Sequence, residues 1–313
     1  MNNVNKITVS ICCITYNHEL FIEQCIEGFL IQKCNFNFEV LIHDDASTDS
    51  TQKIIKEYQK KYPEIIKPIF QTENQYSKDV GGINARYNFS RAKGKYIALC
   101  EGDDYWTDPL KLQRQVDFLE ENEEYVIHSA KAQVLKNGNL EETIGNPLNK
   151  STYDITDFYT KNNLITCTIL FKNIIPKFRE INIKGLLFGD WMLYLQLLDT
   201  QKDAKAYVSN DVVSIYRIHS GGVTQSIKKK FDNCKTHFKQ IIRINEYYNP
   251  KYSLGDIEQI NDYAIFIAKQ YIGKRQFFDF IKTIYQNYKL TGESTYIKKY
   301  LFLIRYYKQI NIN

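Results

Sequence analysis

Residues 7–32 read ITVSICCITYNHELFIEQCIEGFLIQ, and this stretch contains two hydrophobic periodicities in succession. Residues 7–14 are an apolar, β-branched run of strand length, which the polar segment TYNHE interrupts. Apolar residues then recur at the three- and four-residue spacing of an amphipathic helix: Phe21, Ile22, Cys25, Ile26, Phe29 and Leu30. A strand followed directly by a helix begins a βαβ unit and predicts an α/β protein.

The same alternation continues through the first 100 residues. Further strands are predicted at 36–45, 64–71 and 95–100, with a helix at 46–62 and a loop and helix at 81–94. Such βαβ units are right-handed and build a parallel sheet, in which ligands bind beyond the carboxyl ends of the strands. The segments TYN, HDDAS and EGDD each end a strand, so we expect all three to meet at one crevice.

Later patterns are more varied. A helix is predicted with Asp108 as its cap and Pro109 in its first turn, and a hairpin is predicted around Asn137 and Gly138. Residues 164–172 are typical of a strand, a helix begins near Asp190, and 212–226 predict a strand with a Gly-Gly loop. From about residue 226 the pattern becomes helical, with Phe and Tyr interleaved among Lys and Ile.

The composition is that of a soluble globular protein with one large domain and an appendage, or with two domains: 313 residues, 43% apolar and 25% charged. No apolar run approaches the roughly 20 residues that cross a bilayer. The N-terminal sequence enters a strand directly, so no secretory signal is expected. Seven scattered cysteines without a CxxC spacing favour a reducing cytoplasm over a zinc site or a disulfide framework.

The charge is distributed unevenly along the chain. Residues 227–313 hold 16 Lys and Arg against 7 Asp and Glu, a net charge of +9, whereas the whole chain has +5. A basic, aromatic segment suits peripheral docking on the anionic inner face of a membrane. The alternative is a helical lid or a homo-oligomeric (dimerisation) element whose lysines are solvated. No nucleic acid is expected as a partner, because the body is net acidic and contains no reading motif.

Residues 98–109, ALCEGDDYWTDP, place Glu101, Asp103 and Asp104 at a strand end. Oxygen ligands of this kind suit Mn²⁺ or Mg²⁺ arriving with a diphosphate. The alternative is a solvated acidic loop stabilised by the dipole of the next helix. The strand end, the second acidic pair at 44–45 and the aromatic flank favour the metal.

Four segments together resemble successive motifs of the family-two inverting glycosyltransferases of the GT-A fold: VSICCITYNHE, FEVLIHDDASTDST, AKGKYIALCEGDDYWTDPLKL and FGDWMLYLQLL. Each motif alone would be weak, but their order and spacing are specific, and they cover about residues 6–225. The resemblance implies a GT-A (Rossmann-like) nucleotide-sugar-binding domain with a mixed, mostly parallel sheet at 1–225. It leaves 226–313 as a small α-helical C-terminal region.

The activity implied by the resemblance is metal-dependent, inverting transfer of a hexosyl or N-acetylhexosaminyl group. The donor would be a nucleotide-diphosphate sugar, a UDP-sugar, and the acceptor a hydroxyl of a glycan or lipid-linked glycan in surface polysaccharide synthesis, with Mn²⁺ or Mg²⁺ as cofactor. One alternative is a catalytically silent scaffold of the same fold. Another is a dehydrogenase or nucleotidyltransferase, but no GxGxxG follows the first strand.

The resemblance also implies roles for the residues that hold the nucleotide. Thr15 and Tyr16 would line the base and ribose, and Asp45 would accept a hydrogen bond from the uracil ring. Arg86 would contact the nucleotide or its phosphates, and Asp103 would serve the ribose as well as the metal.

Asp104 is the first choice as metal ligand by this resemblance, together with Asp103. His219 has two interpretations: a ligand to the metal or diphosphate from a loop hinged at Gly-Gly, or a hydrogen-bonded surface histidine. His18, beside the TYN segment, is expected to be structural. Glu101 stands where many relatives have an aspartate.

Asp190, in FGDW, matches the general base of the family. Inverting transfer needs one carboxylate to take the proton of the acceptor hydroxyl as its oxygen attacks the anomeric carbon. The alternative for Asp190 is a helix N-cap, which contributes about 1 kcal/mol. The two roles are compatible.

Overall fold

The computed structural model describes residues 6–78, 82–174, 188–222 and 230–310. The chain divides into two compact units. The first consists of Met1–Ile155, Asn163–Gly185 and Gly189–Gly222, and the second of Thr156–Asn162, Leu186–Phe188 and Val223–Asn313. The predicted boundary after residue 225 lies outside the described residues.

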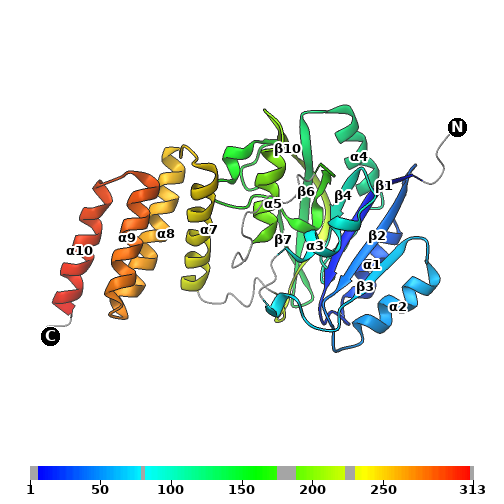
Figure 1. The fold of residues 1–313 in the computed structure, drawn as a ribbon, viewed down its shortest axis with the longest axis horizontal. Coiled ribbons are helices and arrows are strands. Elements are labelled where there is room, and N and C mark those ends of the chain that lie inside the picture. The colour runs from blue at the N-terminus through cyan, green and yellow to red at the C-terminus, as the bar shows by residue number, and fades with distance from the viewer. Residues whose placement is uncertain (1–5, 79–81, 175–187, 223–229, 311–313) are drawn as a thin grey trace. The chain divides into compact units, whose positions relative to one another are not determined.

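The first unit is built on one mixed sheet (Figure 1). Its strands are β1 (Ile7–Thr15), β2 (Asn37–Asp44), β3 (Ile66–Phe70), β4 (Tyr96–Leu99), β5 (Tyr105–Trp106), β6 (Tyr125–Lys136), β7 (Asn139–Ile144), β8 (Thr152–Tyr153), β9 (Leu170–Lys172) and β10 (Lys205–Ile218). The order is β3-β2-β1-β4-β9-β6-β10-β5, with β7 paired to β6 and β8 to β10. As predicted, β1 to β4 are parallel.

The helices of this unit are α1 (Ile22–Leu30), α2 (Thr51–Lys61), α3 (Ile83–Tyr87), α4 (Lys111–Glu121) and α5 (Gly189–Leu198). The apolar stripe predicted for the first helix is its buried face, although the helix begins only at Ile22. The prediction of Asp108 as the cap of the next helix is wrong, since α4 begins at Lys111 with Leu110 as its N-cap. The Asp108 carboxylate accepts the N–H of Leu110 in the preceding turn, at 2.9 Å.

The strand predicted at 164–172 is largely wrong. Only Leu170–Lys172 of this range forms a strand, and Thr166–Thr168 forms a 3-10 turn. The Thr168 hydroxyl donates a 2.8 Å hydrogen bond to the carbonyl of Ile165, which closes the turn locally. The hairpin prediction is confirmed, since Asn137 and Gly138 both have positive φ between β6 and β7.

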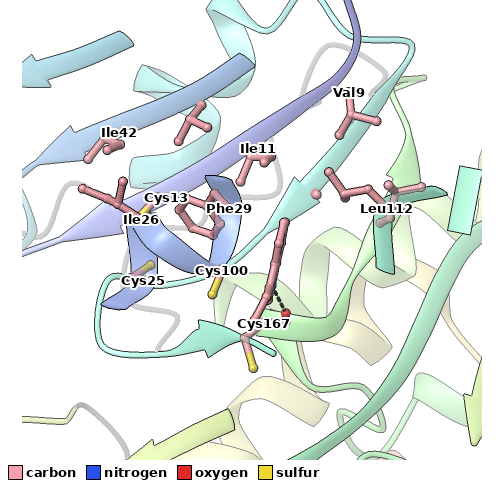
Figure 2. Close-up of a cluster of buried hydrophobic side chains, with 14 of the residues drawn as sticks. Val9, Ile11, Cys13, Cys25, Ile26, Phe29, Ile42, Cys100, Leu112 and Cys167 are labelled. Atoms are coloured by element: carbon pink, nitrogen blue, oxygen red, sulfur yellow. Dashed lines mark hydrogen bonds between the residues drawn. The ribbon is translucent and has the colours of Figure 1, made fainter. Parts of the chain in front are cut away.

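Several core positions between α1 and the sheet are occupied by cysteine. Cys13, Cys25 and Cys100 lie beside Phe29 in the apolar cluster, and all are buried (Figure 2). No disulfide links any of the seven cysteines, all of which lie in the described residues; Cys34 and Cys234 are partly exposed and the other five are buried. Here cysteine acts as a small apolar residue, as the sequence indicated.

The second unit contains α7 (Lys230–Tyr248), α8 (Leu254–Gly273), α9 (Phe277–Thr291) and α10 (Thr295–Ile310), which lie side by side (Figure 1). A capping box of Ser253 and Asp256 starts α8. Asn287 of α9 donates a buried hydrogen bond of 2.6 Å to Asn261 of α8. Among the described residues, no helix combines the length and apolarity required to cross a bilayer.

Candidate functional site

The carboxyl ends of β2, β1 and β4 lie next to one another because the three strands are parallel neighbours. Thr15, the last residue of β1, is paired with Asp44, the last residue of β2. Beyond the strands, the N–H of Asp45 donates to the carbonyl of Thr15, and the N–H of Gly102 donates to that of Ile14, both at 2.9 Å. The predicted meeting of the three segments is confirmed.

Two histidines and one aspartate come together at this edge. The Nε2 atom of His219 lies 3.0 Å from Oδ2 of Asp103, and the Nε2 atom of His18 lies 3.9 Å from the same oxygen. One ligand atom from each residue lies within 4.8 Å of the others. We call these three residues the His/Asp cluster. Their side chains are 16 to 19% exposed, so all three are largely buried but still reach the surface.

His18 is oriented by its neighbours. Its Nδ1 atom lies 3.1 Å from the Thr15 hydroxyl, and its backbone N–H donates to the hydroxyl of Thr51 at 2.8 Å. Gly102 packs against this pair so closely that a Cβ there would lie 2.7 Å from the Thr15 oxygen. With Nδ1 held in this way, Nε2 is the ring nitrogen that faces Asp103.

Arg217, near the end of β10, links that strand to residues 101–104 (EGDD), which we call the acid segment. Its backbone N–H donates to Oδ1 of Asp104 at 2.8 Å. Its guanidinium donates to the carbonyl of Asp103 and to the side chain of Gln24, and lies 4.4 Å from the centre of the Tyr105 ring. This arrangement brings His219, which directly follows β10, close to the acid segment.

The negative charge of the acid segment is concentrated on Asp103. Burial acts to raise the pKa of Asp103, but the hydrogen bond with His219 and the charge of His18 outweigh it, so this pKa lies below its usual value. Burial, and then the charge of Asp103, raises the pKa of Asp104 well above its usual value. Burial followed by the charge of Asp104 does the same to the pKa of Glu101.

The three predicted metal ligands therefore have different surroundings. Asp103 and His219 meet directly, whereas the carboxylate of Asp104 is buried against Arg217 and lies outside the His/Asp cluster. Its assignment as a metal ligand stays a prediction. The donor set of the cluster, two imidazole nitrogens and a carboxylate oxygen, suits a divalent metal.

The residues predicted to hold the nucleotide are partly engaged in supporting loops. Asp45 is buried, and its two carboxylate oxygens accept the backbone N–H groups of Gln75 at 2.8 Å and Tyr76 at 2.9 Å. Tyr16 follows β1 and is exposed, and Arg86 is exposed in the last turn of α3. The structure does not bring Arg86 into the His/Asp cluster, and these nucleotide roles stay predictions.

Asp190 lies in the first turn of α5, where the helix dipole favours a carboxylate. It accepts hydrogen bonds from the hydroxyl of Thr166 at 3.1 Å and from the N–H of Trp191 at 2.8 Å. Its charge also helps to raise the pKa of Glu101, to which burial, Asp104 and Asp103 contribute more. The carboxylate predicted as the base is thus within the electrostatic field of the acid segment.

The structure brings two further residues to this edge that the sequence pattern does not assign to it. The sequence favours a structural role for His18 and indicates no role for Arg217. A signal existed for each, since His18 follows a predicted strand end by a few residues and Arg217 stands two positions before His219. β10 pairs with β5 and so brings the end of β10 to the acid segment. No local sequence pattern indicates this long-range pairing.

Comparison with known proteins places the chain among glycosyltransferases in sequence and fold. The model of the family described as "Glycosyl transferase family 2" matches residues 10–176. An uncharacterised protein of Mycobacterium tuberculosis is 31% identical over 235 residues, which are 73% of this chain and 65% of that protein. The match therefore spans a little under two thirds of this relative.

A second relative has a stated activity. The protein named UDP-Glc:alpha-D-GlcNAc-diphosphoundecaprenol beta-1,3-glucosyltransferase WfaP, from Escherichia coli, is 28% identical over 247 residues, covering 75% of this chain and 83% of its own. Among solved structures, residues 1–349 of TarS from Staphylococcus aureus, in complex with UDP-GlcNAc, superpose with a TM-score of 0.56. That match has 16% identity and covers 97% of this chain and 81% of the other. The likeness to TarS confirms the GT-A fold predicted from the sequence.

Proposed function

The chain belongs to glycosyl transferase family 2, and from this premise we propose that it is a glycosyltransferase, which transfers a sugar from a UDP-sugar to a hydroxyl of a lipid-linked glycan. The transfer would invert the anomeric centre and serve the synthesis of a surface polysaccharide. The name of the Escherichia coli relative, which includes both a UDP-sugar and a diphosphoundecaprenol-linked acceptor, supports this choice of substrates.

The observation that carries the proposal is the arrangement at the strand ends. The His/Asp cluster lies beyond β1 and β4, and Asp190 lies in the field of the same acid segment. The first unit therefore contains both the His/Asp cluster, which can bind a diphosphate-associated cation, and Asp190, whose carboxylate can accept a proton.

Asp190 is assigned as the general base. It would accept the proton of the acceptor hydroxyl while that oxygen bonds to the anomeric carbon and the bond from this carbon to the diphosphate breaks, releasing UDP. The hydroxyl of Thr166 holds one carboxylate oxygen at 3.1 Å and would fix its direction. A single carboxylate suffices, unlike the pair that glycosidases use.

Asp103 and His219 are assigned to the metal, because their ligand atoms are 3.0 Å apart and the charge on Asp103 is maintained. A divalent cation bound there would neutralise the charge that develops on the departing diphosphate, so no protein acid is needed. The residues fit such an ion through the chemistry of their donor atoms.

Thr15, Tyr16, Asp45 and Arg86 are assigned to the nucleotide. Asp45 is the best supported of them, since it follows β2 directly and each of its oxygens, while accepting one backbone N–H, can accept another hydrogen bond. Asp45 holds the backbone of Gln75 and Tyr76, and this segment would line one side of the uracil site.

A thermal-shift screen of nucleotide sugars with Mn²⁺, followed by a transfer assay with a lipid-diphosphate glycan, tests the proposal. We expect a UDP-sugar to raise the melting temperature and to be consumed when acceptor is present. A chain that responds to no nucleotide sugar and transfers none would refute the proposal. Donor binding without turnover on any acceptor would instead indicate the catalytically silent scaffold.

Contact with the membrane is proposed through α9. Phe278, Ile281 and Tyr285 lie on one face of this helix at helical spacing, and are 78%, 63% and 65% exposed. Lys282 and Lys289 are exposed on the same helix, in a region of net charge +9. Exposed aromatic groups beside lysines favour an anionic lipid surface, where a lipid-linked acceptor would be found.

A further inference from the structure

One residue of the site has no part in the reaction described so far. His18 lies three residues beyond β1, and its Nε2 atom faces the same oxygen of Asp103 that His219 contacts. The distance of 3.9 Å is too long for a hydrogen bond, so the ring is directed at the carboxylate without being bonded to it.

The two distances to Asp103 are close to those between ligands of one ion, and all three ligand atoms lie within 4.8 Å of one another. With metal–ligand bonds of about 2.1 Å, neighbouring ligand atoms lie about 3.0 to 3.5 Å apart. His219 already has this spacing from Asp103, and His18 needs to approach by only a few tenths of an ångström. The rings of His18 and His219 are inclined at 82°, with centres 6.1 Å apart, so both can direct an edge toward a common point.

The second ring nitrogen of His18, Nδ1, is held in the way that is usual for a metal-binding histidine. A histidine that binds a metal usually has its second nitrogen held by a hydrogen bond, which fixes the ring and the tautomer. In His18 this second nitrogen, Nδ1, is 3.1 Å from the hydroxyl of the buried Thr15.

Packing enforces the same orientation independently. The backbone N–H of His18 is bonded to Thr51, and Gly102 leaves room for the Thr15–His18 pair that no larger residue would leave. His18 therefore has little freedom to turn Nε2 away from Asp103.

We propose that His18 is a third protein ligand of the metal, so that the site has two imidazoles and one carboxylate and selects Mn²⁺ over Mg²⁺. This inference rests on the proposed function in taking the metal to be the ion that accompanies the donor. Magnesium prefers an octahedron of oxygen ligands, whereas imidazole suits the first-row transition metals. Replacing two oxygens by nitrogens disfavours Mg²⁺ in particular.

The test is Mn²⁺ binding to the full chain, measured by electron paramagnetic resonance with Mn²⁺ alone and with Mn²⁺ and UDP. Spin-echo modulation spectra detect nitrogen bound to Mn²⁺. We expect two imidazole nitrogens in the wild type and one in His18→Gln, with Mn²⁺ affinity at least about tenfold lower in the variant. The matched control is His237→Gln in α7, which should leave both results unchanged.

A second variant addresses the selectivity. His18→Asp replaces an imidazole by a carboxylate, so we expect the ratio of Mn²⁺ to Mg²⁺ affinity to fall relative to the wild type. A purely structural role for His18 would alter the melting temperature in both variants but would not change the number of coupled nitrogens.

Equal nitrogen signals and equal Mn²⁺ affinity in wild type and His18→Gln would overturn the inference. If neither His18 variant folds, the wild-type spectrum still decides, because one coupled nitrogen alone would also overturn it. The proposed function fails separately: a protein that binds Mn²⁺ through two imidazoles but transfers no sugar contradicts only the transferase assignment.

Discussion

Arg217 and Asp104, 113 residues apart in the chain, are joined by a hydrogen bond of 2.8 Å from the backbone N–H of Arg217 to Oδ1 of Asp104. This bond connects the acid segment after β4 to the end of β10. Since His219 follows Arg217 by two residues, the same bond helps to bring the histidine to Asp103. Asp104 thus has a structural role that its sequence context did not reveal.

Two substitutions at Asp104 separate this role from metal binding. We expect Asp104→Asn to retain wild-type stability and Mn²⁺ affinity, because the amide oxygen can still accept the N–H of Arg217. Asp104→Ala should reduce the free energy of unfolding by about 1 to 3 kcal/mol, since it leaves that N–H without its acceptor. Chemical denaturation and Mn²⁺ titration measure the two effects. Loss of Mn²⁺ binding in a stable Asp104→Asn protein would favour the direct ligand role.

Asp190→Asn should lower kcat by about 10² to 10⁴ while donor affinity changes less than about threefold. The amide cannot take the proton of the acceptor, but it can still accept the hydroxyl of Thr166. Steady-state kinetics and donor titration of the same preparation provide the comparison. Undiminished turnover would remove the base assignment, and a parallel loss of donor binding would point to a general structural defect.

Gly102→Ala tests the support behind His18. A methyl group at this position would lie 2.7 Å from the Thr15 oxygen and 3.1 Å from Nδ1 of His18, so the pair must shift. We expect Mn²⁺ affinity to fall about tenfold and stability to fall by about 1 to 3 kcal/mol. Gly273→Ala is the control, because a Cβ there meets nothing within 4 Å. Wild-type Mn²⁺ affinity in Gly102→Ala would show that this packing does not orient the ligand.

Lys111 predicts a pH dependence of stability. It is fully buried in α4, with Nζ 2.8 Å from the side-chain oxygen of Gln115 and 4.0 Å from the centre of the Trp106 ring. Burial lowers its pKa to about 7. An unfolded lysine has a pKa of about 10.4, so between these values the unfolded chain binds more protons and the free energy of unfolding rises with pH.

Because of Lys111, the free energy of unfolding of the wild type should rise by a few kcal/mol (on the order of 3) between pH 6.5 and pH 10. This rise should be absent in Lys111→Met. Denaturation followed by tryptophan fluorescence is suitable, because Trp106 and Trp191 both belong to the first unit. The exposed Lys60→Met in α2 serves as control and should retain the wild-type slope. Identical slopes for the wild type and Lys111→Met would disprove the assignment.

The exposed face of α9 predicts binding to lipid vesicles. A triple change of Phe278, Ile281 and Tyr285 to serine should weaken sedimentation with vesicles containing anionic lipid by at least about tenfold, because it removes the apolar contact area. Binding should also weaken as salt is raised. Leu254→Ser, at an exposed position at the start of α8, is the matched control.

Vesicle binding that is unaffected by the triple change would contradict the lipid assignment. A concentration-dependent change in mass that disappears in the variant, with no vesicle binding in the wild type, would identify the face as a dimer interface instead. Light scattering measures that mass.

Local patterns predicted the parallel part of the fold well. At β1, α1 and β2 the hydrophobic pattern changes from strand to helix and back to strand. The strands are buried on both faces and the helix on one, and the apolar residues follow this burial directly. The helix at 189–198 was also placed correctly. The strand predicted at 164–172 failed because Thr168 bonds to its own turn, a competition that apolar periodicity does not show.

The site was predictable where it depends on strand ends and less so where it depends on long-range pairing. The meeting of Thr15, Asp45 and the EGDD segment follows from parallel topology alone. The contact between His18 and Asp103 depends on hydrogen bonds to Thr15 and Thr51, and the position of His219 depends on β10 pairing with β5. These relationships link distant segments, so no local window of sequence contains them.

The distribution of thiols makes this protein suitable for labelling without mutagenesis. A maleimide reagent should modify Cys34 and Cys234 in the native state and leave the five buried cysteines unmodified. Cys34 should react slowly at neutral pH, because partial burial raises the pKa of its thiol to about 11. Cys34 belongs to the first unit and Cys234 to the second. A donor and acceptor dye at these two positions would therefore report, by energy transfer in single molecules, any movement between the units as the nucleotide sugar binds.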